Sequence, residues 1–193
     1  MKELSFDVIK MAVKNNGYKW FEDKLNIVGI RTKDTTTDLF NDFIVVAYTS
    51  KNGEEPHNNF IGFNATTDPG LYYLNNPMNV KGTGILVEGQ YIDCWQKGNH
   101  KGHDALIQCR PVSVYRDNDR DNYLTFDKTT IDTGYFGLNI HRAHVGIIQK
   151  LIGKYSAACQ VIQSNSAYEK FYKICLDSGQ KYFTYTLLNE TQL

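Results

Sequence analysis

Several features that mark other classes of protein are missing from this sequence. Its 193 residues contain no run of about 18 apolar residues, so we expect no membrane-spanning helix. Basic and acidic residues balance at 21 each, which argues against binding to nucleic acid or an anionic membrane through bulk charge. The first residues, 1–7, lack the apolar stretch of a secretory signal peptide. We therefore expect a soluble protein that is made in a cytoplasm.

The cysteines also lack the close pairing that common metal and redox motifs require. No C-x-x-C pair occurs among the four, which excludes a zinc ribbon and favours free thiols: Cys94, Cys109, Cys159 and Cys175. Hydrophobic residues make up 41% of the chain and charged residues 22%, which is typical of a globular domain. We expect one domain over residues 1–193, with a helical segment over 1–25 and the main domain over 26–193.

Helices are predicted near both ends of the chain. Residues 5–16 place apolar side chains on one helical face, and Ser5 is suited to be the N-cap. A second helix is predicted from a capping box formed by Ser166 and Glu169, and Gly179 is expected to follow its end.

Strands are predicted from apolar runs and from alternating patterns between turn signals. The predicted strands cover residues 26–31, 43–48, 71–74, 84–87, 91–95, 105–108, 112–115, 135–141 and 181–188. Polar loops are expected over 32–38, 50–59 and 98–103. This order of elements predicts the α+β class, rich in strand, with a helix near each end.

The residues most suggestive of chemistry are a histidine that ends an apolar strand and a cysteine among small residues. His141 is followed by fourteen residues and then by Ser156, Ala157, Ala158 and Cys159. A cysteine nucleophile needs a base such as histidine, and we expect His141 to lower the pKa of Cys159 and so make it selectively reactive. The backbone amides of Ala158 and Cys159 are candidates for an oxyanion hole. A buried cysteine and a surface histidine without catalytic roles would give the same pattern.

This spacing resembles the signature of the L,D-transpeptidase (YkuD-like) catalytic domain, in which a histidine precedes Ser/Thr-His-Gly-Cys. The resemblance implies a mixed β-sheet or sandwich fold, Cys159 as nucleophile, His141 as general base and Ser156 at the Ser/Thr position. It also implies a backbone carbonyl as the group that orients His141. The chain departs from the family pattern, because Arg142 stands where Gly is usual and Ala157 and Ala158 replace the second His and the Gly.

A broader likeness links the chain to a group of uncharacterised phage and prophage proteins that are thought to degrade peptidoglycan. It rests on the segments 26–31, 66–70, 114–117 and 140–142, together with Ser156-x-x-Cys159-Gln160. The likeness implies a lysin-type peptidase that cleaves stem-peptide amide bonds without a cofactor or metal. It would act on the cell wall after release, or from the virion, and a phage setting favours water as the acceptor.

Four side chains are predicted to contact such a substrate. They are His100, Arg116, Arg142 and Gln160; Arg110 is a further candidate, because arginine grips carboxylates bidentately and peptidoglycan stems carry free carboxylates. Each arginine is equally well explained as a surface ion pair.

Other functions remain open from the sequence. L,D-transpeptidation proper has the same motif. A zinc-dependent wall peptidase would use His100 and His103 with His141 or His144, although no H-E-x-x-H motif supports it. The acidic segment 117–121 has the alternation of a calcium loop but lacks its glycine and final glutamate, so we expect a solvated turn. A catalytically inactive phage structural or binding module is the non-enzymatic alternative.

Overall fold

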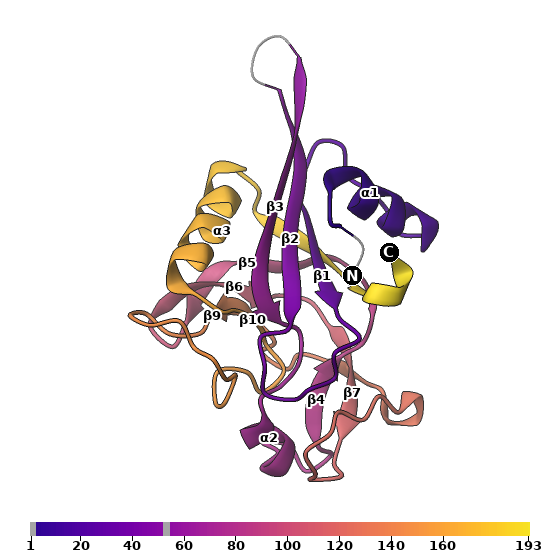
Figure 1. Cartoon of the computed structure of the whole chain (residues 1–193), viewed down its shortest axis with the longest axis vertical. Helices are drawn as coiled ribbons and strands as arrows, with labels where there is room; N and C mark the ends of the chain where they lie inside the picture. Colours follow the sequence, from indigo (N-terminus) through magenta and orange to yellow (C-terminus); the bar gives the residue numbers. More distant parts are fainter. Residues whose placement is uncertain (1–2, 52–54) are drawn as a thin grey trace.

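A closed, mixed β-barrel forms the body of the protein (Figure 1). In this computed structural model, which describes residues 3–51 and 55–193, eight strands follow one another around the barrel in the order β1-β11-β5-β6-β9-β10-β3-β2. Their bounds are β1 Asn26–Arg31, β2 Asp42–Lys51, β3 Pro56–Thr66, β5 Gly89–His100, β6 His103–Gln108, β9 Ile140–Arg142, β10 Gln160–Ile162 and β11 Tyr182–Asn189. The pairs β1–β11 and β9–β10 are parallel, and the other recorded pairs are antiparallel.

A small antiparallel sheet lies at one end of the barrel (Figure 1). It contains β4 Thr83–Leu86, β7 Val112–Asp117 and β8 Asp132–Gly134, in the order β4-β7-β8. The short helix α2 Leu71–Asn75 lies at the same end, and the 3-10 turns are η1 Lys128–Thr130 and η2 Glu190–Gln192.

Two longer helices flank the strands β1 to β3 on opposite sides (Figure 1). Helix α1 spans Phe6–Asn15, and the Ser5 side chain caps it by accepting a hydrogen bond from the Val8 amide at 3.3 Å. Helix α3 spans Asn165–Asp177 and joins β10 to β11. None of the helices in the described part of the chain has the length and apolar character needed to cross a membrane.

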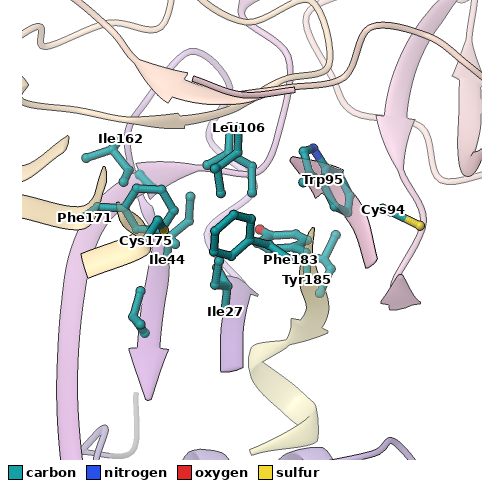
Figure 2. Close-up of a cluster of buried hydrophobic side chains, with 14 of the residues drawn as sticks. Ile27, Ile44, Cys94, Trp95, Leu106, Ile162, Phe171, Cys175, Phe183 and Tyr185 are labelled. Atoms are coloured by element: carbon teal, nitrogen blue, oxygen red, sulfur yellow. The ribbon is translucent and has the colours of Figure 1, made fainter. Parts of the chain in front are cut away.

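Strands β1 and β2 are buried on both faces, because the barrel interior lies on one side of them and helix α1 lies on the other. Successive side chains of a strand point to opposite faces, so Ile27 of β1 joins the barrel core while Val28 packs in a second cluster with α1. Figure 2 shows the barrel core, where Trp95, Phe183 and Tyr185 are fully buried. The Trp95 indole donates to the Leu138 carbonyl at 2.8 Å, so this polar group is satisfied inside the core.

The predicted class, a β-rich α+β fold with a helix near each end, is confirmed. Several predicted elements are wrong in detail. Residues 71–74, predicted as a strand, form α2, because the Gly70 carbonyl accepts hydrogen bonds from the amides of Tyr73 and Leu74 and starts a helical turn. The predicted strand over 135–141 is restricted to the three residues of β9.

Two predicted loops are β-hairpins. In 50–59, predicted as a polar loop, the strands β2 and β3 continue and pair Ser50 with His57; residues 52–54 of that loop lie outside the described residues. Residues 98–103 hold the ends of β5 and β6, joined by Lys101 and Gly102 with φ of 52° and 83°. Positive φ at both central residues is the signature of a type I′ hairpin turn.

The N-cap of α3 lies two residues before the serine that the sequence predicts. Ser164, rather than Ser166, caps α3, and its side chain accepts a hydrogen bond from the Ala167 amide at 3.2 Å. The serine that caps is the one with extended backbone geometry, so the helix begins at Asn165 and Ser166 lies inside it.

Candidate active site

The candidate base and nucleophile lie on neighbouring parallel strands of the barrel. His141 is in β9 and pairs with Val161 of β10, and Cys159 directly precedes β10. Cys159 and Val161 are two residues apart and therefore face the same side. That side is the outside of the barrel, because the alternate residues Ile140 and Ile162 belong to the barrel core. The fold thus brings the two ends of the motif to one surface.

A backbone carbonyl orients the His141 ring. Its Nδ1 lies 2.7 Å from the Arg142 carbonyl oxygen, which can only accept, so Nδ1 carries the proton. The Nε2 atom then holds the lone pair, and this buried atom has no hydrogen-bond partner among the described residues. Burial lowers the pKa of His141 to about 4, and the nearby His100, Lys101 and Arg142 add to the effect. His141 is therefore a neutral imidazole whose unpartnered Nε2 is the site that can accept a proton, although burial makes that nitrogen a weak base.

The Cys159 thiol is covered by its surroundings. Its sulfur accepts a hydrogen bond from the Asn139 amide at 3.4 Å, and the thiol donates to the Gly137 carbonyl at 3.7 Å. The residue is 9% exposed and packs with Ala143 and Val161, over which Phe40 and Tyr155 lie.

The expectation that His141 lowers the pKa of Cys159 is not met. Burial raises the pKa of the Cys159 thiol, and the Asn139 amide offsets only part of that effect. A neutral imidazole supplies no positive charge that would stabilise a thiolate. The resting pair is thus a neutral thiol and a neutral imidazole, and no hydrogen bond joins them, because Cys159 Sγ bonds to Asn139 and Gly137 and His141 Nε2 has no partner among the described residues.

Ser156 braces the loop that leads to the cysteine. The fully buried Ser156 hydroxyl donates to the Cys159 carbonyl at 2.8 Å and accepts from the Ala158 amide at 3.3 Å. Ser156 therefore acts on loop geometry through two internal hydrogen bonds. The Ala158 amide, predicted as an oxyanion donor, is engaged by this hydroxyl and must leave it to reach a substrate.

Ala158 itself has an unusual backbone conformation. Its φ is 151°, in the region that side chains other than glycine rarely adopt. The motif that the sequence resembles has glycine at this position, and glycine adopts such a φ without strain. Backbone strain is often stored next to functional groups.

His100 reaches the site from the tip of the β5–β6 hairpin. Its ring stacks on that of His141, with centroids 4.8 Å apart and planes 29° from parallel. The Asn139 side-chain amide lies 3.0 Å from His100 Nδ1. Asn139 was missed by the sequence reasoning. Its position two residues before His141, directly before β9 and so on the same face, is the signal that would have identified it.

A cavity of about 340 Å³ opens beside His141. Its charged and titratable lining is mostly basic: His100, Lys101, His103, Asp104, His141, Arg142, His144 and Lys154. Asp104 is the one acid in that lining among the described residues. Cys159 is not part of this lining, nor of that of a second cavity of about 290 Å³ bordered by Ala157 and Ala158.

The predicted substrate contacts have different positions. Arg142 lines the basic cavity, and its guanidinium donates to Asn165 at the start of α3 at 2.6 Å. Arg116 lines the second cavity but is 8% exposed and ion-paired with Asp132 at 3.1 Å. Arg110 lies over the Tyr182 ring at 5.8 Å.

Gln160 does not face either cavity. Its side chain is fully buried, donates to the Thr67 carbonyl at 3.2 Å and accepts from the Tyr185 hydroxyl at 2.7 Å. Because strand side chains alternate, the residue after Cys159 points into the barrel. Gln160 was predicted to contact the substrate, but its side chain is buried inside the barrel.

The remaining candidates from the sequence are a zinc site, the acidic segment 117–121 and the other three cysteines. Within residues 3–51 and 55–193, no group of three or more His, Cys, Asp or Glu side chains is arranged to hold a metal ion. In the acidic segment, Asp117 accepts from the amides of Asp119 and Thr125 and so closes a turn. Cys94 and Cys175 are buried in the core, whereas Cys109 is half-buried, and all four cysteines are free thiols.

Comparisons with protein-family models, curated proteins and solved structures found no match for this chain.

Proposed function

We propose that the chain is a cysteine acyltransferase of L,D-transpeptidase type that acts on amide bonds of peptidoglycan stem peptides. The observation that carries this proposal is the pairing of β9 with β10, which puts His141 and Cys159 on one face with a free basic nitrogen on His141. The Arg142 carbonyl that fixes the His141 tautomer is the kind of orienting group that the resemblance implies. We also propose that the barrel is a version of the L,D-transpeptidase fold.

The chemistry begins from the neutral pair. The thiol turns from the Gly137 carbonyl, and His141 Nε2 takes its proton as the sulfur attacks the amide carbon. The new S–C bond gives a tetrahedral oxyanion; as this intermediate collapses the C–N bond breaks, and His141 returns the proton to the leaving amine. Water then attacks the thioester, which releases a carboxylic acid and restores the thiol. An amine in place of water would give transpeptidation.

The developing oxyanion would be held by backbone amides at Cys159 and Ala158. The Ala158 amide lies 3.3 Å from the Ser156 hydroxyl in the resting structure, so substrate binding would exchange that contact for one to the oxyanion. Ser156 keeps its other hydrogen bond to the Cys159 carbonyl and thus holds the loop during the exchange.

The basic cavity supports a substrate that carries carboxylates. Lys101, Arg142 and Lys154 line it together with histidines, so a negatively charged peptide is attracted to the side of His141. Arg142 can grip a carboxylate while its backbone carbonyl orients the catalytic ring. A phage setting favours hydrolysis over cross-linking, with action on the wall after release or from the virion.

The proposal is tested by trapping the acyl-enzyme. Purified protein is mixed with soluble stem peptides, quenched in acid and examined by intact-mass spectrometry, with Cys159→Ala as the matched control. We expect a thioester adduct on the wild type and none on the variant. Addition of a small amine to the reaction separates the two acceptors, because a transpeptidase forms a new amide product and a peptidase forms only the acid. An adduct of equal yield on both proteins would refute Cys159 as nucleophile.

A binding module is the second candidate, and the covered thiol favours it. Cys159 is 9% exposed and burial raises its pKa, as in a structural cysteine. Such a module would bind wall fragments with the same affinity in the wild type and in Cys159→Ala, and it would form no adduct. Activity that persists with a metal chelator would in turn exclude the zinc-peptidase alternative.

A further inference from the structure

A chain of hydrogen bonds fixes the orientation of the Asn139 side chain. The Gln108 backbone amide donates to Asn139 Oδ1 at 3.1 Å. A backbone amide can only donate, so the oxygen of the Asn139 side chain must face Gln108 and its NH2 group must face the other way. That NH2 group lies 3.0 Å from His100 Nδ1.

This orientation selects one protonation state of His100. Because the Asn139 NH2 group can only donate, His100 Nδ1 must accept, and the proton of the neutral ring is on Nε2. Protonation of Nδ1 would place two donors against each other. Flipping the Asn139 side-chain amide would remove that clash. It would, however, set the Asn139 NH2 group against the Gln108 backbone amide, which is also a donor. The geometry thus disfavours a charged His100.

The state of His100 bears directly on His141 because the two rings stack at 4.8 Å. A positive charge on His100 would be repelled by Lys101 beside it, and a ring displaced by that repulsion would let water reach the His141 face. The groups around the pair are Lys101 and His103 on the hairpin, Asp104 on β6, Arg142 on β9, and His144 and Lys154 on the following loop.

We propose that Asn139 and His100 are positioning residues that hold His141 as a neutral, desolvated base for Cys159. Asn139 locks His100 in its neutral tautomer, and the stacked His100 ring covers His141. The part about Cys159 depends on the proposed function, whereas the coupling of Asn139, His100 and His141 does not. The depressed pKa values of both histidines are consistent with it.

The test follows the histidine ring protons by NMR as a function of pH in the intact protein. Asn139→Asp is isosteric and turns the donor that faces His100 into an acceptor, so we expect the pKa of His100 to rise by at least one unit. His100→Ala uncovers His141, and its pKa should rise toward the usual value for histidine, whereas His100→Phe keeps a stacked ring and should leave it low. His103→Ala removes an unstacked imidazole of the same hairpin and is the matched control. His57, on the β2–β3 hairpin, serves as the internal reference.

An unchanged pKa of His100 in Asn139→Asp would show that Asn139 does not fix the protonation state of His100. An unchanged pKa of His141 in His100→Ala would show that the His100 ring does not shield His141 from solvent. The acyl adduct formed on Cys159 from soluble stem peptides is then measured by intact mass in the wild type and in the same variants. If the ring titrations shift as expected but no adduct forms on the wild type, the coupling of the histidines is correct and the proposed function fails. If the rings do not shift and Cys159 still forms an acyl adduct, the proposed function stands and this inference fails.

Discussion

Replacement of Ala158 by glycine should stabilise the protein. The φ of Ala158 is 151°, and residues in such sparsely populated regions cost about 1–3 kcal/mol. Glycine removes that cost, but the greater conformational entropy of its unfolded chain lowers the stability by about 0.4–1 kcal/mol. It also loses one half-buried methyl group. The expected net change is an increase of about 1 kcal/mol in the free energy of unfolding.

The neighbouring alanine provides the matched control. Ala157 is half-buried like Ala158 and borders the same cavity, but its φ is not positive. Ala157→Gly therefore gains the same entropy in the unfolded chain without releasing strain in the folded state, and its free energy of unfolding should fall by about 0.5–1 kcal/mol. The difference between the two variants isolates the strain at Ala158.

Urea denaturation followed by fluorescence gives both values, provided that the slope of free energy against denaturant is unchanged. A difference of about 1–3 kcal/mol between the two glycine variants is expected. If both variants lose the same amount of stability, Ala158 is not strained, and the physical reason offered for a glycine at this motif position is wrong.

Three further predictions concern the loops and the thiols. Asp38 accepts two backbone amide hydrogen bonds, from Gly153 at 2.7 Å and Leu71 at 3.0 Å, so Asp38→Asn should lower the free energy of unfolding in urea by about 1–2 kcal/mol. Burial, together with the neighbouring Asp42 and Glu88, raises the pKa of Asp68 to about 7 against the opposing ion pair with Arg31 at 2.8 Å. The folded state then binds more protons than the unfolded state between the two pKa values, so stability should fall as pH rises from 4 to 7, and Asp68→Asn should flatten that slope. Iodoacetamide at pH 7 should label the half-buried Cys109 before the covered Cys159, as peptide mapping would show; burial raises the pKa of both thiols, so the order reports how well each is covered, and faster labelling of Cys159 would contradict its burial.

Elements with a strong local signal were predictable from the sequence. The apolar runs of β1 and β2 and the capped helix α1 were found because their patterns follow the periodicity of the element. The hairpin β2–β3 was missed because its outer part is exposed on both faces, so its residues are polar and carry no alternation. The helix α2 was missed because the Gly70 turn overrides the strand preference of its tyrosines.

Closure of the barrel and the details of the site depend on contacts between distant segments. The parallel pairing of β9 with β10 follows from their places in the barrel, and a spacing of fourteen residues does not reveal it. The motif that selects His141 and Cys159 as candidates rests on residue type and order, which are local information. The burial of Cys159, the bracing role of Ser156 and the stack of His100 on His141 depend on side chains brought together by the fold, so one sequence could not supply them.

The central claim is that Cys159 and His141 cleave stem-peptide amide bonds, and digestion of purified peptidoglycan tests it most directly. Released fragments are analysed by mass spectrometry for the wild type, Cys159→Ala and His141→Ala, after circular dichroism has shown that each protein is folded. We expect fragments with a new carboxyl group at a stem-peptide bond from the wild type and none from Cys159→Ala, with a strongly reduced yield from His141→Ala. Undiminished release of the same fragments by folded Cys159→Ala would contradict the account.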